Sequence, residues 1–355
     1  MRRPGKRSCQ PRGSLSINPT VSIVVPCFNE ARTIGQLLEA VRGQTYSLDR
    51  IEVVIADGGS TDGTVAVIRG FAEEHPELKI RVVDNPKRVI PAALNAAVGQ
   101  ATGEIIIRLD AHSKPAPDYV ERCLGALDHT NAANVGGVWE IRPSDDHWIG
   151  RGIAAAAAHP IGAGDARYRV HGQAGPVETV PFGAFRRSWL DRAGQFNENL
   201  HSNEDYEYNW RIRRLGGTIW FDPTIRSVYY ARRTLSELAR QYARYGFWKA
   251  RMLLRFPNSL RWRQAVPPMF VLSSLGLLVA ALFVQPAGIA LGVEWGAYML
   301  LLLLAGLGSA VRGRDPALFF SFPLAAATMH LAWGAAFWIG LVTGITGVRI
   351  GSNRS

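Results

Sequence analysis

Acidic side chains follow apolar runs of the sequence at two places in the first third of the chain. Asp57 follows the run IEVVIA, and Asp110 follows EIIIRL, with His112 two positions later. Carboxylates accept hydrogen bonds from the base and ribose of a nucleotide, and carboxylate or imidazole groups bind the divalent cation that a diphosphate needs. An Asp-X-His triplet is common in ordinary loops. Its place at the end of one apolar run, with Asp57 at the end of another, favours a nucleotide and metal site.

Two further groups of polar residues lie later in the chain. Glu204 and Asp205 follow the polar stretch NENLHSN and precede a helix-like segment. Two carboxylates at this point either favour the helix dipole or supply a general base that deprotonates an acceptor hydroxyl. Gln241, Arg244 and Tyr245 gather an amide, a guanidinium and an aromatic ring on a basic helix. This second group is suited to a diphosphate or an acceptor sugar, or else it faces lipid.

Alternating strand and helix patterns predict parallel βαβ units over residues 21–110. Strand-like runs cover 21–25, 51–56, 80–83 and 104–109, and amphipathic helix patterns lie between them. Ligands of such sheets lie beyond the carboxyl ends of the strands, where both acidic turns stand. Later strands are predicted over 135–141 and 177–185, and the Ala- and Gly-rich stretch 150–176 has no assignment.

Apolar runs dominate the last quarter of the sequence. They cover roughly 267–284, 287–310 and 317–345. Each approaches the ~20 residues that cross a bilayer, and Glu294 is the only formal charge within 264–311. Basic residues precede the first run and follow the second, so the positive-inside rule places both flanks in the cytoplasm and, after three crossings, the C-terminus outside. A basic, aromatic helix over 234–256 either lies in the membrane interface or packs on the protein surface.

The net charge of +11 is unevenly distributed. Residues 206–263 hold thirteen Arg and Lys against three acids, directly before the apolar runs. Anionic lipid headgroups therefore suit this charge better than nucleic acid does. Cys9, Cys27 and Cys123 are widely spaced, which excludes a disulfide framework or zinc site and fits a reducing cytoplasm. Residues 1–20 are basic, lack the apolar core of a secretory signal, and are predicted to be disordered.

Assembled in order, these motifs resemble family 2 glycosyltransferases of the GT-A fold over residues 21–250. VSIVVPCFNEARTI is similar to the family's first strand and its loop, ADGGSTDGT to the second, and RLDAH stands where the family usually has Asp-X-Asp. SNEDYEYNWRIRRLG resembles the family's Glu-Asp segment, and QYARY resembles Gln-X-X-Arg-Trp with Tyr245 replacing Trp. Together with DNPKRVIPAALN, these segments look most like bacterial exopolysaccharide enzymes of the succinoglycan glucosyltransferase type.

The resemblance implies an α/β fold of the GT-A nucleotide-diphospho-sugar transferase type with a C-terminal transmembrane helical region. It implies that Asp205, beside Glu204, is the catalytic base, and that Asp110 and His112 hold Mn²⁺ or Mg²⁺. The implied nucleotide-binding residues are Pro26, Asn29, Glu30, Asp57, Lys87, Arg88 and Asp110. The implied acceptor or diphosphate residues are Gln241, Arg244 and Tyr245.

The predicted function is that of a membrane-associated inverting glycosyltransferase. It would move a sugar, glucose by resemblance, from a UDP-sugar to a polyprenyl-linked saccharide in exopolysaccharide or cell-envelope glycan synthesis. The chain would lie in the bacterial inner membrane with a cytoplasmic catalytic domain, and nucleic acid is not an expected partner. One alternative is a polyprenyl-phosphate sugar synthase, in which the lipid phosphate itself is the acceptor. Another is a membrane-anchored nucleotide-sugar-binding scaffold without catalysis.

The predicted organisation has four parts. A basic tail covers 1–20, the catalytic domain 21–233 and the interface helices 234–263, and three transmembrane helices lie within 264–348. A processive polysaccharide synthase is a poorer match, because Trp is absent at 245 and three spans make a poor polymer channel.

Overall fold

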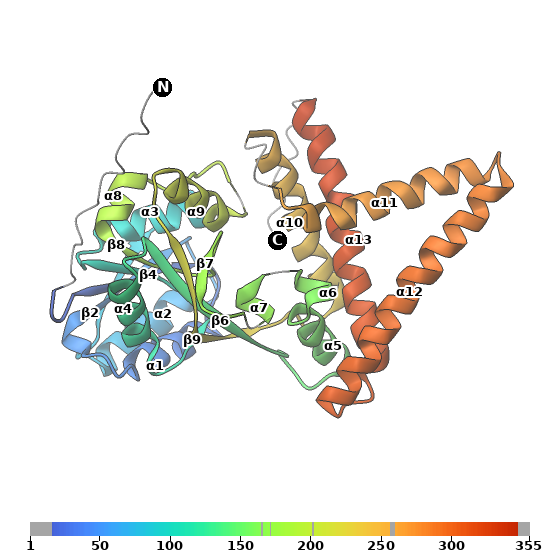
Figure 1. Cartoon of the computed structure of the whole chain (residues 1–355). Coiled ribbons are helices and arrows are strands. Elements are labelled where there is room, and N and C mark those ends of the chain that lie inside the picture. Colours follow the sequence, from blue (N-terminus) through green and yellow to red (C-terminus); the bar gives the residue numbers. More distant parts are fainter. Residues whose placement is uncertain (1–15, 165, 171, 201, 256–259, 347–355) are drawn as a thin grey trace, which may run out of the picture.

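A mixed β-sheet forms the centre of the N-terminal two-thirds of the molecule (Figure 1). The computed structural model describes residues 16–346 except 165, 171, 201 and 256–259. The strands are β1 (Val21–Cys27), β2 (Ile51–Asp57), β3 (Lys79–Asp84), β4 (Ile105–Arg108), β5 (Lys114–Pro115), β6 (Asn134–Arg142), β7 (Gly175–Val177), β8 (Ala184–Arg186) and β9 (Ile219–Tyr230). Across the described residues they form one sheet in the order β3-β2-β1-β4-β8-β6-β9-β5, with β7 paired to β9.

The first four predicted strands are confirmed, and they pair in parallel. They are connected by α1 (Ile34–Arg42), α2 (Thr64–Glu74) and α3 (Ile90–Gln100). Helix α1 buries the apolar positions that its 3.6-residue period places on one face: Ile34, Leu37, Leu38 and Val41. Because the strands are parallel, the chain segments that follow β1, β2 and β4 meet at one edge of the sheet. Asp57 and Asp110 both lie at that edge.

The strand predicted over 177–185 is wrong, because two short strands with different partners lie there. β7 ends at Val177 and pairs with β9, whereas β8 begins at Ala184 and pairs with β4 and β6. Phe182 and Gly183 have positive φ angles of 61° and 89°. This backbone, next to a proline that has no N–H donor, interrupts the extended conformation. The strand predicted over 135–141 is confirmed as β6.

The stretch 150–176, which has no assignment from sequence, is largely helical. It contains most of α5 (Trp148–Ala157), α6 (Pro160–Ala163) and α7 (Arg167–Val170). The other helices around the sheet are α4 (Tyr119–Thr130), α8 (Arg187–Ala193) and α9 (Glu204–Arg214). Figure 1 shows α5, α6 and α7 between the sheet and the C-terminal helices, so the unassigned stretch forms the junction between the two parts of the molecule.

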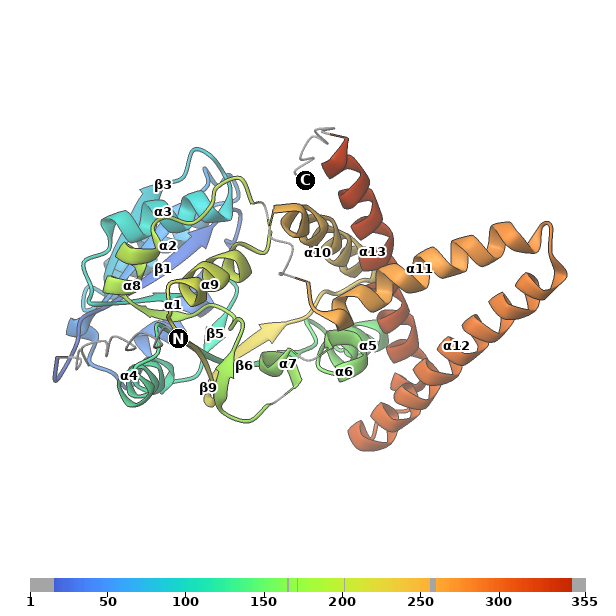
Figure 2. The ribbon, with the colours of Figure 1, turned by 45° about the horizontal axis from the view of Figure 1, so that its top comes forward.

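Four long helices complete the chain: α10 (Leu235–Arg255), α11 (Trp262–Ala281), α12 (Gln285–Gly313) and α13 (Leu318–Ile345). The last three coincide with the predicted apolar runs and are long and apolar enough to cross a membrane. α11 and α12 form a hairpin that extends away from the sheet, with Leu282 and Phe283 exposed at its tip (Figures 1 and 2). In contrast, α13 packs against α5 and α10.

The folded domain begins before Val21. Residues 1–15 of the predicted tail lie outside the described residues, but residues 16–20 already contact the sheet. The Tyr46 hydroxyl donates to the Pro19 carbonyl at 2.7 Å, and the Ile105 N–H donates to the Thr20 carbonyl at 3.0 Å. The prediction of disorder therefore does not hold for residues 16–20.

Gly137→Ala is expected to destabilise the fold by about 1–3 kcal/mol, because a Cβ at Gly137 would lie 1.8 Å from the Ile225 carbonyl oxygen, which belongs to the backbone. The pairing of β6 with β9 shifts register at this glycine. Thermal unfolding of the detergent-solubilised protein measures the effect. Gly125→Ala is the control, because it lies in helix α4 with nothing within 4 Å of a new Cβ. Equal unfolding temperatures for the two variants would contradict this account of the register shift at Gly137.

Candidate active site

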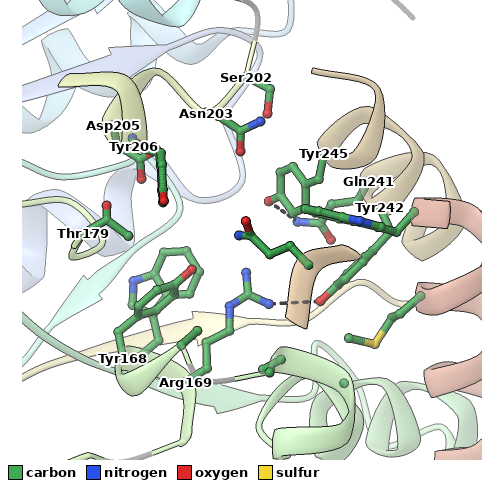
Figure 3. Close-up of a pocket in the computed structure, with 18 of the residues that line it drawn as sticks. Tyr168, Arg169, Thr179, Ser202, Asn203, Asp205, Tyr206, Gln241, Tyr242 and Tyr245 are labelled. Carbon is green, nitrogen blue, oxygen red and sulfur yellow. Dashed lines mark hydrogen bonds between the residues drawn. The ribbon is translucent and has the colours of Figure 1, made fainter. Parts of the chain in front are cut away.

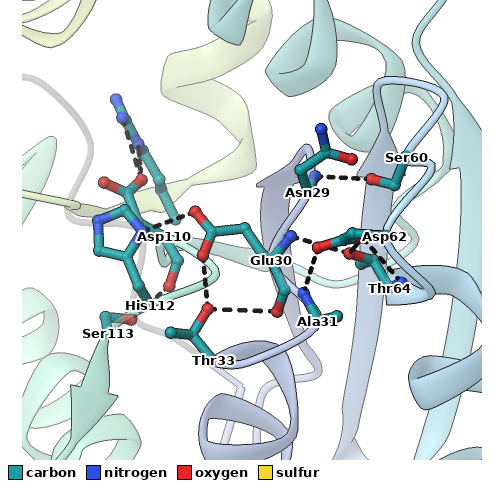
Figure 4. A network of polar contacts seen from close by, with 11 residues as sticks. Asn29, Glu30, Ala31, Thr33, Ser60, Asp62, Thr64, Asp110, His112 and Ser113 are labelled. Atoms are coloured by element: carbon teal, nitrogen blue, oxygen red, sulfur yellow. Dashed lines mark hydrogen bonds and ion pairs between the residues drawn. The ribbon is translucent and has the colours of Figure 1, made fainter. Parts of the chain in front are cut away.

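Hydrogen bonds connect the loop that follows β1 to the loop that follows β2 (Figure 4). The Asp57 carboxylate accepts from the N–H groups of Gly59 and Ser60, each at 2.9 Å. Asn29 donates its N–H to Ser60 Oγ at 2.8 Å and accepts from the Thr61 N–H at 2.9 Å. Asp57 and Asn29 therefore shape the loops themselves. Their contacts with a nucleotide stay predictions. A carboxylate or amide oxygen can accept two hydrogen bonds, so lone pairs remain on these side chains for such contacts.

Glu30, His112 and Asp110 lie close together at the same edge of the sheet (Figure 4). His112 Nδ1 is 3.0 Å from Glu30 Oε1, and Glu30 also accepts from the Thr33 hydroxyl. Burial lowers the pKa of His112, but the hydrogen bond to Glu30 and the charge of Asp110 outweigh it, so the pKa is raised above its usual value. Glu30 thus orients the imidazole, a contact that the motif alone did not reveal.

The predicted metal ligands Asp110 and His112 keep suitable atoms available. Asp110 Oδ1 accepts from Arg108, whereas Asp110 Oδ2 and His112 Nε2 make no hydrogen bond within the described part of the chain. A ligating histidine commonly has its other ring nitrogen held by a carboxylate, as Glu30 does here. No group of three or more His, Cys, Asp or Glu side chains placed for a metal occurs among the described residues. The pair therefore fits a cation whose other ligands come from a diphosphate and water.

Arg108 is a buried cation that the sequence patterns did not single out. It ends β4, and its Nη2 donates to Asp110 Oδ1 at 3.2 Å and to Glu204 Oε1 at 3.0 Å. One guanidinium thus joins the end of β4 to the first turn of α9. An arginine inside the apolar run IIIRL could have revealed it, because a charge in a buried strand needs an opposite charge beside it.

Glu204 and Asp205 begin α9 but have different partners. Glu204 is buried and paired with Arg108, whereas Asp205 forms no ion pair with a described residue and accepts the Tyr206 N–H at 2.7 Å. Burial and the Glu204 charge raise the pKa of Asp205 to about 6, although the Arg108 charge acts in the opposite direction. Such a carboxyl group is ionised at neutral pH and accepts a proton more readily than an ordinary aspartate.

Tyr206 connects α9 to the C-terminal helices. Its hydroxyl donates to Glu178 Oε2 at 3.0 Å, and the same oxygen accepts from Arg261 Nε at 2.7 Å. Lys249 of α10 lies with Nζ 3.7 Å from the centroid of the Tyr206 ring, and burial lowers the pKa of Lys249 to about 7. The residue that follows Asp205 is therefore tied to α10 and to the start of α11.

A cavity of about 810 Å³ lies beside these groups (Figure 3). Its lining includes the metal pair, the carboxylate pair and the basic-helix group: Asp110, His112, Glu204, Asp205, Gln241, Arg244 and Tyr245. Gln241 Nε2 donates to the hydroxyl oxygens of Tyr229 at 3.0 Å and Tyr245 at 2.9 Å. Three motifs that are far apart in the sequence thus meet in one cavity, which also reaches α11 and α13.

The remaining predicted nucleotide residues lie outside the lining of this cavity. Lys87 pairs with Glu198 at 2.5 Å. Arg88 has a φ of 54°, and its guanidinium carbon lies 5.7 Å from the centroid of the Phe28 ring, beside the loop that follows β1. Pro26 belongs to β1 itself. Their nucleotide roles stay predictions, and Arg88 is close to the loop that Asp57 shapes.

The fold and the cavity define a class of enzyme. A mixed sheet whose parallel strands end in acidic loops, with an Asp-X-His pair and adjacent carboxylates in one cavity, is the arrangement of a GT-A glycosyltransferase. Residues 22–194 match the family described as Glycosyl transferase family 2. The chain is also 34% identical to the succinoglycan biosynthesis protein ExoA of Rhizobium meliloti (strain 1021), over 89% of this chain and 93% of that protein. It belongs to glycosyltransferase family 2.

Two further similarities extend over most of the chain. A dolichyl N-acetyl-α-D-glucosaminyl phosphate 3-β-D-2,3-diacetamido-2,3-dideoxy-β-D-glucuronosyltransferase of Methanococcus voltae is 24% identical over 91% of this chain and 98% of that protein. Among solved structures, the mannosyltransferase PcManGT of Pyrobaculum calidifontis, in complex with GDP-Man and Mn²⁺, has a TM-score of 0.62 and 25% identity. The similarity covers 90% of this chain and 88% of that one.

Proposed function

We propose that this enzyme is a membrane-associated inverting glycosyltransferase that moves a sugar, glucose in the first instance, from a UDP-sugar to a lipid-linked saccharide. The observation that carries this proposal is the single cavity that holds Asp205, has the metal pair among its lining and extends to the membrane-type helices α11 and α13. Such a cavity can receive a water-soluble donor and a lipid-attached acceptor together. The similarity to ExoA supports a place in exopolysaccharide or cell-envelope glycan synthesis.

The proposed reaction is one displacement. Asp205 takes the proton of the acceptor hydroxyl while that oxygen forms a bond to the anomeric carbon of the donor sugar. The bond from this carbon to the diphosphate breaks, and its electron pair leaves with the nucleoside diphosphate, so the configuration inverts. Asp110 and His112 would hold Mn²⁺ or Mg²⁺, which supplies positive charge for the leaving group. Arg108 and Glu204 keep Asp110 and α9 in position.

The proposed place in the cell rests on the charges that flank the hairpin. Arg261 is the N-cap of α11, and Arg263 lies in the first turn of that helix. Arg312 lies in the last turn of α12, and Arg314 directly follows the helix. The positive-inside rule puts both groups, and with them the catalytic domain, on the cytoplasmic face of the bacterial inner membrane. Nucleotide sugars are then available to the cavity directly.

The donor and the acceptor class can be tested together. Membranes that contain the full-length enzyme are incubated with radiolabelled UDP-glucose, other UDP-sugars and GDP-mannose, and the lipids are then extracted. Label from UDP-glucose in a lipid-linked oligosaccharide is the expected result. Label from GDP-mannose alone would overturn the donor proposal. Label only in a lipid-linked monosaccharide phosphate would favour the alternative, a polyprenyl-phosphate sugar synthase.

Glu204→Gln is expected to move the acidic limb of the pH profile of kcat/KM to lower pH. In the wild type this rate constant should fall as pH drops below about 6, because Asp205 takes up a proton and no longer acts as a base. The charge of Glu204 raises the pKa of Asp205, so its removal lowers that pKa. Glu121→Gln, on the exposed surface of α4, is the matched control. An acidic limb that stays in place in Glu204→Gln would contradict the assignment of the base.

A further inference from the structure

Arg169 is a buried cation in the cavity, and no described carboxylate forms an ion pair with it. It belongs to α7, is 8% exposed and lines the same cavity as Asp205. Its Nη1 donates to the Tyr242 hydroxyl at 3.1 Å, and its Nε has no hydrogen-bond partner among the described residues. No Asp or Glu among the described residues forms an ion pair with it. A charge buried without an opposite charge is unfavourable, and an anion that enters the cavity would relieve this.

Aromatic rings hold the Arg169 guanidinium in place (Figure 3). Its Cζ lies 5.2 Å from the centroid of the Trp139 ring and 5.6 Å from that of Tyr168. Trp139 in turn stacks on Tyr229, with centroids 4.4 Å apart and 6° between the planes. A planar guanidinium that is held between aromatic rings and a tyrosine hydroxyl presents its N–H donors in few orientations, which suits recognition of a phosphate group.

The lining of the cavity is mixed where it meets α11 and α13. Pro267, Met329 and Trp333 are apolar, whereas Arg263, Gln264 and His330 are polar or charged. A site that combines cations with apolar side chains fits an anionic head on a hydrocarbon tail. We propose that Arg169 binds the phosphate that links the acceptor saccharide to its isoprenoid, with the isoprenoid directed towards α11 and α13. This inference rests on the proposed function and assigns a residue to the recognition of its lipid-linked acceptor.

Binding measured on the full-length protein in detergent tests this site. Farnesyl phosphate is the probe, farnesol is the same chain without the phosphate, and UDP with Mn²⁺ reports on the donor side. Arg169→Gln is expected to weaken farnesyl phosphate binding at least about tenfold, as loss of a charged hydrogen bond does, while farnesol and UDP bind as in wild type. Arg169→Lys should fall between the two, because it keeps the charge but loses the planar stack. Arg240→Gln, exposed on α10, is the control.

Each other outcome has a distinct meaning. If Arg169→Gln weakens UDP instead of farnesyl phosphate, the guanidinium serves the donor diphosphate and the proposal fails. Equal weakening of farnesol and farnesyl phosphate would show that Arg169 only supports the cavity wall. A wild-type enzyme that transfers sugar but does not bind farnesyl phosphate would overturn this site and leave the proposed function standing.

A separate observation concerns α13, which follows α10 over most of its length. A Cβ at Gly246 of α10 would meet the backbone of Trp333, and Arg251 of α10 donates to Thr343 Oγ1 at 3.2 Å. Both contacts advance in the same direction, so the two helices run parallel, side by side (Figures 1 and 2). The hairpin of α11 and α12 also contacts α13, but it leaves most of its apolar surface exposed.

Helix α10 is too charged to enter the hydrocarbon. Arg240, Arg244 and Arg255 are exposed along it, and charges at the centre of a bilayer are costly. If α13 crossed the membrane, its parallel neighbour α10 would have to cross too. The geometry therefore points to two crossings, by α11 and α12, with α13 lying at the cytoplasmic interface beside α10. The end of α13 is then on the side of the catalytic domain, in contrast to the three crossings expected from hydropathy.

Reporter fusions to the full-length chain test this topology. Green fluorescent protein fused after Ser355 is expected to fluoresce, and alkaline phosphatase at the same position is expected to be inactive. Alkaline phosphatase inserted at the hairpin tip, after Phe283, is expected to be active outside the cytoplasm. An active phosphatase after Ser355 would support three crossings and overturn the two-crossing topology. An inactive phosphatase at the tip would show that the hairpin enters the membrane without crossing it, and would overturn the proposal as well.

Discussion

Asp205→Asn is expected to lower turnover by about 10²–10⁴-fold, the contribution of a positioned general base, with donor affinity unchanged to within about twofold. Asparagine keeps the shape of the side chain and can still accept the Tyr206 N–H, but it cannot take the acceptor proton. The cavity and the start of α9 should therefore persist. Initial rates with a lipid-linked acceptor give kcat and KM, and calorimetric titration with UDP and Mn²⁺ gives donor affinity.

Glu204→Gln is the comparison that makes this result decisive. The two carboxylates are adjacent, but Glu204 is paired with the buried Arg108 and Asp205 is not. Glu204→Gln should therefore retain substantially more turnover than Asp205→Asn. If Glu204→Gln is inactive and Asp205→Asn is active, the roles of the two residues are exchanged. If Asp205→Asn stays fully active because a lipid phosphate is the acceptor, the polyprenyl-phosphate synthase is the better reading, since a phosphate needs no base.

Apolar periodicity was sufficient to predict the helices and strands whose buried positions recur at regular spacing. The α1 pattern and the first four strands followed from it, because each buries a regular set of apolar positions. It failed at 177–185, where the reversal at Phe182 and Gly183 comes from the pairing of β7 and β8 with distant strands. The Ala- and Gly-rich stretch 150–176 had no assignment from sequence. Close contact with α13 requires small residues there, and these carry little apolar pattern. A Cβ at Gly152, for example, would lie 2.4 Å from Ser321 Cβ.

The candidate site was also predictable only in part: motifs identified several of its residues but not the side chains that they contact. Motifs placed Asp110 and His112 after a strand, Asp205 near a helix start and Gln241 on a basic helix, and the structure brings all four to one cavity. Sequence could not show which residues they contact, because pairs such as Glu30 with His112 are 82 positions apart. Two cations were missed for this reason. Arg108 stood alone in an apolar strand, and Arg169 lay in the unassigned stretch 150–176. Neither residue therefore formed a motif with its neighbours in sequence.

Asp110→Asn is expected to weaken UDP binding in the presence of Mn²⁺ by at least about 100-fold, because outer partners of a metal site alone are worth 10–100-fold and Asp110 would be a direct ligand. Asparagine removes the charge but still accepts from Arg108, so β4 and α9 should stay joined. UDP binding without metal should differ little between variant and wild type, which separates lost ligation from a damaged loop. Asp118→Asn, an aspartate paired with Arg122 on the surface of α4, is the control for charge. If Asp110→Asn binds UDP with Mn²⁺ as the wild type does, Asp110 is not a metal ligand and its ion pair with Arg108 is its whole role.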